Sequence, residues 1–433
     1  MAQLHRTLPF LAASSLVARA LLSIGRLALA AGLVALTAVT AAAQTAPDGP
    51  GAVSHFGIAR KDCLGTARNT TSKVWYTVAN GVLSDVYYPT VDNTNVETLQ
   101  YIVTDGATFT DLQTRDMTYT VKSSDAGGME CVVTATAKSG KYEIVTSYLT
   151  DPGANTLLLR VRFKPSVDGL RLFIRFDPSV NGNGGGGSAN SGGDSATIDT
   201  STGHLVPVAF DTVTVTNAAN RDYAQPVFVA LDGSRPFSQA TVGFAGVSSD
   251  GLVQLDAAMT LTNQFTQATN GNVVVTAEAK LSEEGDGSFT LALGFGSTQA
   301  EAAMAAERSL AQGFPSAQAS YRDGWKAYDD SLEPPPSKLP GLKKKRVNEL
   351  GDEYYLSANL VKAAEDKTFP GAIVASLAAP WGQALPANDP NNSFFGSYRE
   401  VFARDLYQAW TALVVAGDQA TARDTVSFLF DRQ

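Results

Sequence analysis

The chain has 433 residues, of which 44% are hydrophobic and 17% are charged, with 42 acidic against 33 basic residues. These proportions suit one or two folded domains and exclude a wholly disordered chain. The formal net charge of −9 argues against binding to nucleic acids or anionic lipids, which attract basic surfaces.

Residues 1–43 have the features of an export signal. They contain no acidic residue, Arg19 and Arg26 precede an apolar run, and small residues close the segment at Ala43. This layout is typical of a cleaved signal peptide; the alternative, a retained membrane anchor, needs about 20 apolar residues. We expect a periplasmic or secreted protein whose mature N-terminal tail spans 44–54. The mature protein would contain 30 basic and 42 acidic residues, with a formal net charge of −12.

The mature chain keeps two cysteines, Cys63 and Cys131. In an oxidising compartment these two could form a disulfide. The sequence does not show whether their Cα atoms approach to about 6 Å, so paired and free thiols both stay open. Two histidines, His55 and His204, are too few for a zinc cluster or a Ser–His triad, and we assign no metal and no cofactor.

Short β-prone runs separated by turns fill most of the first two thirds of the mature chain. Asn80-Gly81 between two such runs is typical of a hairpin. Pro165 and Pro178 are expected to end the strands before them, because proline cannot donate to a ladder. The pattern predicts an antiparallel β-sandwich over 55–296. Later strands are predicted at 212–216, 227–230, 251–260, 272–279 and 288–294.

A glycine-rich segment, 181–193, matches G-x-G-x-x-G at Gly182, Gly184 and Gly187. A dinucleotide fingerprint must open a helix, whereas more Gly, Ser and Asn follow here. We therefore predict a flexible loop and no cofactor site.

Helical spacing replaces strand alternation after Gly296. Helices are predicted at 298–312, 316–328 with Ser316 as N-cap, 343–366, 404–416 and 419–433. The proline-rich stretch after the second helix is the clearest domain boundary. The predicted organisation is a signal peptide (1–43), a tail (44–54), a β-sandwich (55–296), a helical and Pro-rich linker (297–342) and a partial helical domain (343–433).

The stretch FFGSYREVFARDLYQAW, residues 394–410, combines aromatic and charged side chains. Tyr398 and Phe402 offer flat apolar faces suited to a sugar ring, and Arg404 and Asp405 offer donors and acceptors for vicinal hydroxyls. The alternative is an ordinary helix start, in which Asp405 complements the helix dipole and Arg404 pairs with an acid such as Glu400.

Two parts of the sequence resemble one known family. Residues 62–106 resemble the N-terminal β-sandwich domain of bacterial glucodextranases and prokaryotic glucoamylases, most specifically in SKVWYT, GVLSDVYYP and LQYIVTDG. The runs PGAIVASLAAPWG and YREVFARDLYQAW resemble the start of the same family's catalytic domain, glycoside hydrolase family 15. The resemblance covers roughly 55–433.

The resemblance implies a mainly β N-terminal domain, an antiparallel β-supersandwich, followed by a helical linker and the first helices of an incomplete (α/α)6 barrel. It implies an exported, exo-acting α-glucan hydrolase of the glucan 1,4-α-glucosidase or glucodextranase type, which releases β-D-glucose from non-reducing ends by inversion. Its partners would be starch, maltodextrin, dextran or their oligosaccharides, with no nucleic acid and, once the signal is cleaved, no membrane.

The resemblance also implies roles for the opening motif. Tyr398, Arg404 and Asp405 match the family's first sugar-binding motif, where Arg and Asp hold hydroxyls of the terminal glucose and Tyr packs near the scissile bond. Phe402 stands where the family usually has Trp, which puts a hydrogen bond of the indole N–H in doubt.

Inverting hydrolysis uses two carboxyl groups about 6.5–9.5 Å apart. In the family both are Glu residues of later barrel loops, and Glu349, Glu353, Glu365 and Glu400 lie in neither catalytic motif. We therefore expect a C-terminally truncated, catalytically silent fragment with no catalytic residue of its own.

Two other classes of protein remain open. The first is a non-catalytic module whose sandwich binds or chaperones carbohydrate. The second is a structural protein without sugar affinity, in which Trp75, Tyr87 and Tyr88 only pack strands. No acidic loop has EF-hand spacing, so no calcium is assigned.

Overall fold

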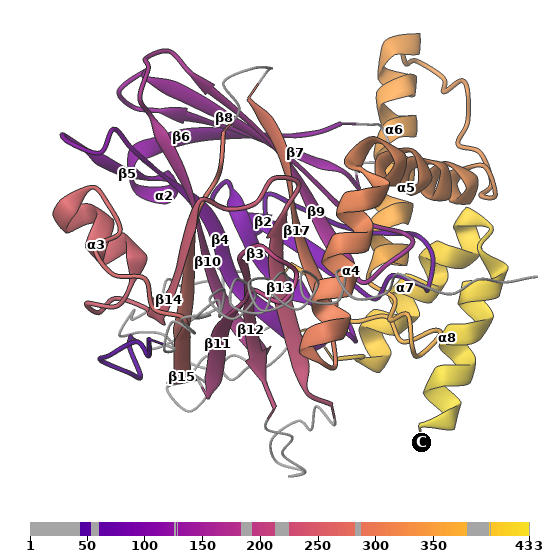
Figure 1. The fold of residues 1–433 in the computed structure, drawn as a ribbon. Helices are drawn as coiled ribbons and strands as arrows, with labels where there is room; N and C mark the ends of the chain where they lie inside the picture. Colours follow the sequence, from indigo (N-terminus) through magenta and orange to yellow (C-terminus); the bar gives the residue numbers. More distant parts are fainter. Residues whose placement is uncertain are drawn as a thin grey trace, which may run out of the picture. The chain divides into compact units, whose positions relative to one another are not determined.

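Two antiparallel β-sheets stack face to face, as the short β-prone runs separated by turns predict (Figure 1). This computed structural model describes residues 44–52, 60–124, 127, 129–182, 193–212, 225–281, 287–378, 398 and 400–432, all within one compact unit, Ala43–Gln433. The predicted signal segment and most of the glycine-rich loop lie outside the described residues.

The sheets have eight and nine strands. In spatial order the first contains β1 (Cys63–Thr66), β2 (Trp75–Ala79), β3 (Val82–Tyr87), β4 (Thr94–Thr104), β10 (Arg171–Gly182), β16 (Val273–Glu278) and β14 (Gln239–Phe244), with β5 (Thr110–Leu112) paired to β4. The second contains β15 (Gln267–Gly271), β11 (Asp194–Asp199), β12 (Val206–Asp211), β13 (Val227–Gly233), β17 (Ser288–Gly296), β9 (Thr156–Pro165), β8 (Tyr142–Thr150), β7 (Cys131–Ala137) and β6 (Met117–Ser123).

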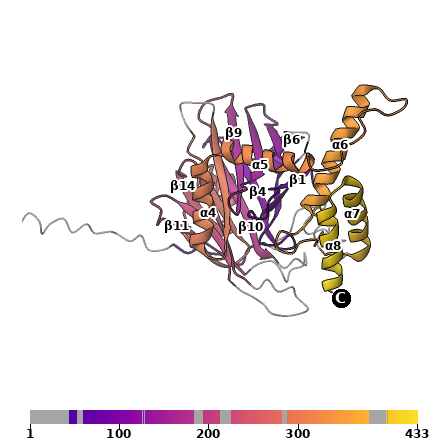
Figure 2. The same cartoon turned by 90° about the vertical axis from the view of Figure 1, so that its right-hand side faces the viewer.

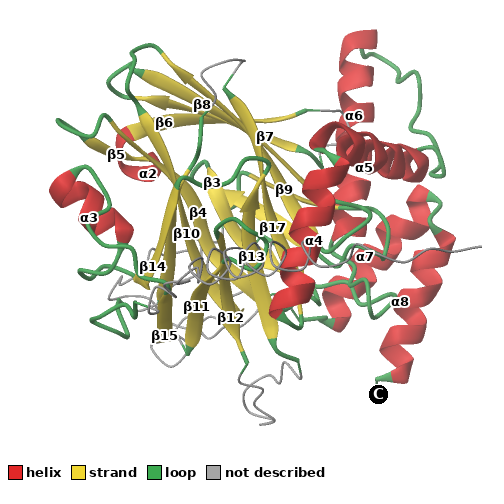
Figure 3. Cartoon of the chain, in the orientation of Figure 1, coloured by secondary structure: helices red, strands yellow, loops and turns green. Residues whose placement is uncertain are grey.

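Most of the helices follow the strands in sequence. Figure 3 shows the helices in red and the strands in yellow. The helices are α2 (Gln113–Asp116), α3 (Gly251–Ala258), α4 (Gln299–Gln312), α5 (Phe314–Asp329), α6 (Lys344–Ala363), α7 (Ala403–Ala416) and α8 (Gln419–Asp431). Helix α4 packs on the nine-stranded sheet, and α6, α7 and α8 gather on one side of the sheets (Figure 2). Of the helices that the structure describes, none has the length and apolar character to cross a bilayer.

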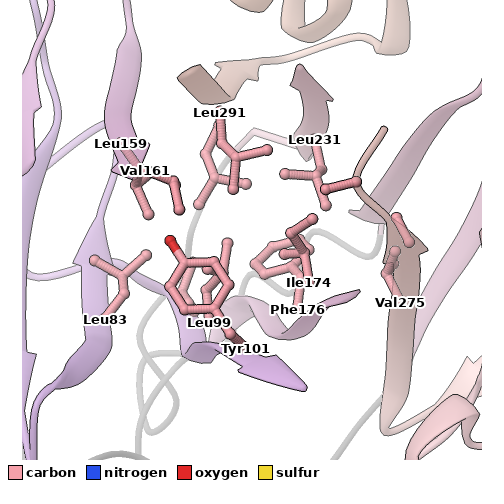
Figure 4. Packing of buried hydrophobic residues seen from close by; sticks show 14 of the residues in the cluster. Leu83, Leu99, Tyr101, Leu159, Val161, Ile174, Phe176, Leu231, Val275 and Leu291 are labelled. Atoms are coloured by element: carbon pink, nitrogen blue, oxygen red, sulfur yellow. The ribbon is translucent and has the colours of Figure 1, made fainter. Parts of the chain in front are cut away.

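The main core fills the space between the two sheets (Figure 4). The eight-stranded sheet contributes Leu83, Leu99, Tyr101, Ile174, Phe176 and Val275, and the nine-stranded sheet contributes Leu159, Val161, Leu231 and Leu291. All ten are at most 1% exposed. Burial of one such aliphatic or aromatic side chain stabilises a fold by about 1.5–3 kcal/mol, so this layer holds the sandwich together.

The hairpin of β2 and β3 faces two cores at once. Its turn is Asn80-Gly81, with φ of 53° and 73°, the left-handed pair that favours Asn-Gly and that the sequence predicts. Successive side chains of a strand point to opposite faces. Tyr76 therefore packs between the sheets, while Trp75 and Tyr87 pack against the helices in a second buried cluster.

Cys63 and Cys131 form a disulfide, which settles the alternative that the sequence left open. Their Cα atoms are 6.3 Å apart, and the bond joins β1 of one sheet to β7 of the other. It closes a sequence separation of 68 residues.

The strand predicted at 251–260 is wrong, because this segment forms helix α3. Asp250 caps the helix: its Oδ1 accepts the Leu252 N–H over 2.9 Å. The cap and the buried Leu255 select a helix over the extended form, although the apolar residues are also compatible with a strand.

Two other boundaries also differ from prediction, and one predicted strand stays untested. Strand β9 ends at Pro165 as expected, but β10 continues past Pro178 to Gly182, because register shifts at that proline absorb its missing N–H. Ser316 is not an N-cap: α5 begins at Phe314, with Pro315 in its first turn. The strand predicted at 212–216 lies, except for its first residue, outside the described residues.

We expect Asp194→Asn to raise the free energy of unfolding at pH 7. Burial raises the pKa of Asp194 well above its ordinary value, and the nearby carboxyls of Asp211 and Asp177 raise it further. The Val180 N–H, which donates to Asp194 Oδ2 over 2.9 Å, lowers this pKa and partly opposes the shift. Because the folded pKa exceeds the unfolded one, the wild-type fold loses stability as the pH rises from about 4 through the folded pKa. Asn does not titrate.

Urea denaturation between pH 4 and pH 8 measures this effect, and the Asn variant should show the flatter profile. Asp168→Asn, which removes an exposed carboxyl, controls for the change in net charge. Equal pH slopes for wild type and Asp194→Asn would contradict the argument.

Candidate functional site

The predicted site lies where the extended segment 372–378 meets the approach to helix α7. Ala375 N–H donates to Glu400 O over 3.0 Å, and Ser376 N–H donates to Tyr398 O over 2.9 Å. These two bonds hold the backbone before α7 against the segment. The position of Tyr398 therefore depends on what holds the segment.

The β-sandwich holds the segment through two aromatic donors. Tyr87 Oη donates to Leu377 O over 2.9 Å, and Trp75 Nε1 donates to Ala363 O, at the end of α6, over 2.9 Å. Both side chains are at most 1% exposed. These aromatics therefore do more than pack strands: they are buried against the helices, and their polar atoms fix the helical part of the chain.

Asp366 makes a third link, which the sequence analysis missed. Its Oδ2 accepts the Val91 N–H over 2.8 Å, and its Oδ1 accepts the N–H groups of Thr368 and Phe369 over 2.7 and 2.9 Å. Burial raises the pKa of Asp366, although these three bonds oppose the shift. The sequence offered one local sign of this role: Asp366 lies two residues before Thr368, a spacing at which an Asp side chain often accepts the backbone N–H of a turn.

Lys367 makes a fourth link. Its ammonium group donates to Ala67 O and lies 5.2 Å from the centre of the Trp75 ring. Burial lowers the pKa of Lys367 well below its ordinary value. The chain between α6 and α7 is thus attached to the sandwich by both charged and neutral groups.

The four predicted site residues lie at the N-terminal end of α7. Tyr398 is 45% and Phe402 41% exposed, while the side chains of Arg404 and Asp405 are 85% and 36% exposed. Arg404 Nε lies 3.7 Å from Asp405 Oδ2. The motif is thus local and open to solvent in the part of the chain that the structure describes.

A cavity of about 430 Å³ lies beside this motif. Segment 372–378 forms the largest part of its wall, and α6 and α7 add aliphatic residues. Polar groups come from Ser376, Asp405 and Gln408. Of the four predicted residues, its described lining includes Asp405. The cavity can therefore offer a carboxylate, a hydroxyl and an amide to a polar ligand.

The alternative view of the motif also has support. Helix α7 begins at Ala403, and Asp405 lies in its first turn, where a carboxylate complements the helix dipole. The ion pair of Arg404 with Asp405 is exposed, and such pairs contribute about 0–1 kcal/mol. These local roles do not compete with ligand binding, because both side chains still face solvent.

Three of the candidate glutamates have structural partners. Glu349 and Glu353 accept from Arg346 Nη1 over 3.2 and 3.1 Å on the exposed face of α6. Glu365 pairs with Lys362 and accepts the Gly371 N–H over 2.9 Å. Their contacts stabilise helix and turn geometry.

Helices α7 and α8 leave large apolar side chains exposed. Val415, Phe430 and Tyr407 are 73%, 66% and 65% exposed. An apolar groove of about 410 Å³ separates α6 from α7, with Tyr354 and Leu413 in its wall.

We expect Tyr87→Phe to loosen segment 372–378 without unfolding the sandwich. The change keeps the ring and removes the donor to Leu377 O, and an unsatisfied buried carbonyl costs about 1–3 kcal/mol. Hydrogen exchange should show faster exchange of the Ala375 and Ser376 amides.

Tyr142→Phe is the matched control, because that hydroxyl donates to Asp111 Oδ2 over 2.8 Å within the sandwich. It should leave exchange in the segment unchanged. Unaltered exchange in Tyr87→Phe would show that the sandwich does not hold the segment.

Comparison with known proteins gives a consistent result. Residues 46–330 match the family model described as Glucodextranase, domain N. The chain is 31% identical over 385 residues to a glucoamylase of Clostridium sp. (strain G0005), an alignment that covers 89% of this chain and 50% of the relative. The structure of this chain is similar to the crystal structure of a bacterial glucoamylase complexed with acarbose, with a TM-score of 0.75 and 29% sequence identity. The match covers 89% of this chain and 52% of the other chain.

The chain thus spans about half the length of these two relatives. The matches confirm the resemblance to bacterial glucodextranases and glucoamylases that the sequence motifs predict. Because the family model covers residues 46–330 of 433, well over half of the sequence, the chain belongs to the glucodextranase domain N family.

Proposed function

We propose that this chain is part of an exported, exo-acting α-glucan hydrolase that releases β-D-glucose from non-reducing ends by inversion. The observation that supports this most is the structural similarity to an acarbose-bound glucoamylase, with a TM-score of 0.75 over 89% of the chain. That coverage extends beyond the sandwich into the helical region. The helices after the sandwich would be the first of an (α/α)6 barrel.

In this proposal the α7 motif holds the terminal glucose. The Arg404 guanidinium and the Asp405 carboxylate lie within 3.7 Å of each other, a spacing that suits donation to and acceptance from neighbouring hydroxyls. Tyr398 would cover the apolar face of the ring. The hydrogen bonds of segment 372–378 hold the backbone at Tyr398 and Glu400, so the sandwich would act as a positioning support.

The two carboxyl groups of the inverting reaction are assigned to no residue of this chain. Glu349, Glu353 and Glu365 have the structural partners given above. The relatives are about twice as long as the part that aligns, and we place the acid and the base in the remainder of the catalytic domain.

Export is the other part of the proposal. The Cys63–Cys131 disulfide supports it, because stable disulfides form in oxidising compartments. Mass spectrometry of the protein recovered from the periplasm or medium should find an N-terminus at Gln44. An uncleaved N-terminus in the membrane fraction would favour an anchor.

A chimeric enzyme tests the activity. Residues 44–433 of this chain would replace the matching half of the Clostridium glucoamylase, and glucose release from maltooligosaccharides and isomaltooligosaccharides would be followed. We expect release of β-glucose, with the preferred linkage showing which α-glucan is the substrate. A folded chimera that releases no glucose from either series would overturn the proposal.

The chain from residue 44 onward, assayed alone, is the companion measurement. We expect no glucose release, because the proposal places the catalytic carboxyl groups elsewhere. Release that disappears in Arg404→Ala would mean that a glutamate of this chain performs the chemistry.

A further inference from the structure

A second groove, of about 700 Å³, lies on the sandwich and is separate from the α7 motif. Helix α4 forms one wall, with Glu301, Met304 and Arg308, and a loop before β9 forms the other, with Asn155. Tyr88, which follows β3, also lines it. None of its described lining residues belongs to α6, α7 or α8.

Buried hydrogen bonds fix α4 to the opposite wall. Ser309 Oγ donates to Asp151 Oδ2 over 2.6 Å, and both residues are fully buried. Thr156 Oγ1 donates to Ala305 O over 2.9 Å. The width of the groove is therefore set before any ligand arrives, which lowers the entropy lost on binding.

The loop wall is held in the same way. Asn69 Nδ2 donates to Pro152 O over 2.8 Å, and Lys73 N–H donates to Asn155 Oδ1 over 2.9 Å. Asn155 O in turn accepts the N–H of Phe295 over 2.9 Å. Asn155 Nδ2 has no hydrogen bond to the described residues and is left to serve a ligand.

The floor of the groove is apolar and aromatic. The rings of Tyr88 and Phe295 lie 5.3 Å apart, with Phe295 buried and Tyr88 half-buried. Met304 lies beside them on α4 and is 58% exposed, although most methionines of a fold are buried. An exposed thioether next to a tyrosine ring is a surface that a flat apolar face of a ligand can cover.

The rim is polar and carries both signs of charge. Glu301, Met304 and Arg308 are spaced i, i+3 and i+7, so they share one face of α4. Glu307 and Arg308 are exposed and make no hydrogen bond or ion pair with another described residue. The groove thus offers a free guanidinium, a free carboxylate and a free amide above an aromatic floor.

We propose that this groove is a second carbohydrate site that binds successive pyranose units of an α-glucan chain. Tyr88 and Met304 contact the C–H faces of the sugars, and Arg308, Glu307 and Asn155 bind their hydroxyls. Two carboxylates against one guanidinium argue against a phosphate or another anion. The choice of an α-glucan as ligand rests on the proposed function. The fit to a neutral polyhydroxylated ring rests only on the residues that line the groove.

Isothermal titration of residues 44–433 with maltoheptaose tests the site. We expect saturable binding that becomes at least about tenfold weaker in Met304→Ala/Arg308→Ala, because both an apolar contact and a hydrogen-bond donor to the sugar are lost. Both positions are exposed on a helix, where alanine is well tolerated, and circular dichroism verifies the fold. Tyr88→Leu, compared with the exposed Tyr119→Leu, tests the floor.

Two controls separate this site from the α7 motif and from general surface effects. Arg160→Ala, which replaces an exposed arginine of β9 outside both sites, should bind maltoheptaose like wild type. In an Arg404→Ala background, Met304→Ala/Arg308→Ala should still weaken the binding of maltoheptaose. Absence of binding by the wild-type protein, or binding that Met304→Ala/Arg308→Ala leaves unaffected in either background, would overturn the proposal.

The same titrations distinguish this proposal from that of the hydrolase. Binding of cellohexaose in preference to maltoheptaose, sensitive to the groove variants, would overturn the α-glucan assignment. Maltoheptaose binding that depends on the groove residues, together with an inactive chimera, would support the second carbohydrate site and contradict the proposed hydrolase function.

Discussion

Replacing Arg404 by alanine in the chimeric glucoamylase should lower kcat/KM for maltooligosaccharides by about 100-fold or more. A hydrogen bond to a charged group contributes about 1.5–3 kcal/mol, and 1.4 kcal/mol is a factor of ten. A guanidinium that donates to two hydroxyls therefore accounts for an effect of this size. Steady-state kinetics of glucose release measures it.

Replacement of Arg404 should affect substrate binding without affecting the fold. The Arg404 side chain is 85% exposed, and its ion pair with Asp405 is long, at 3.7 Å, so its loss should leave stability unchanged. Arg404→Lys should fall between wild type and alanine, because lysine keeps the charge but not the planar fork. Arg423→Ala on α8 is the control for an exposed arginine outside the motif.

Equal kcat/KM for wild type and Arg404→Ala, in a folded chimera that releases glucose, would contradict the role of the motif. The ordinary helix start would then be the whole explanation of this stretch. A loss confined to KM would indicate that Arg404 holds the substrate and the transition state equally.

Removing the Cys63–Cys131 disulfide should lower the free energy of unfolding of the sandwich by about 4 kcal/mol. The bond closes a loop with a sequence separation of 68 residues. Chain-entropy arguments assign about 3 kcal/mol to a 15-residue loop and about 4.7 kcal/mol to a 100-residue loop, which brackets this one. Urea unfolding of Cys63→Ser/Cys131→Ser, followed by tryptophan fluorescence, measures the change.

Wild-type protein treated with a reductant should unfold at the same urea concentration as the double variant. The single variants Cys63→Ser and Cys131→Ser should match it too, since each removes the same bond. Unchanged stability of the double variant would mean that sheet pairing alone holds β1 to β7.

Several features of this protein could be predicted from local sequence. Alternation of side chains along β7 and β8 predicts two-faced strands, since the faces of a strand repeat every two residues. Asn80-Gly81 predicts its hairpin because both residues tolerate positive φ. Helices α7 and α8 begin and end within two residues of the prediction, because an apolar stripe, Gly417 and the capping Asp418 lie next to one another in sequence.

The sequence motifs also identify the family, but they did not identify the supports of the site. Tyr87 and Leu377 are 290 residues apart, and Trp75 and Ala363 are 288 apart. No local pattern marks either pair as partners. Asp366 and Lys367 likewise acquire their roles from groups on the sandwich.

Only the tertiary structure decided the fate of ambiguous segments and the existence of the second groove. Residues 251–258 are compatible with strand or helix until the Asp250 cap and the packing of Leu255 select the helix. Tyr88, Asn155, Phe295 and Met304 form one surface because the strand order of two sheets and the docking of α4 bring them together. Local hydrogen bonds and side-chain periodicity act over a few residues, whereas such surfaces depend on packing between elements that are far apart in the chain.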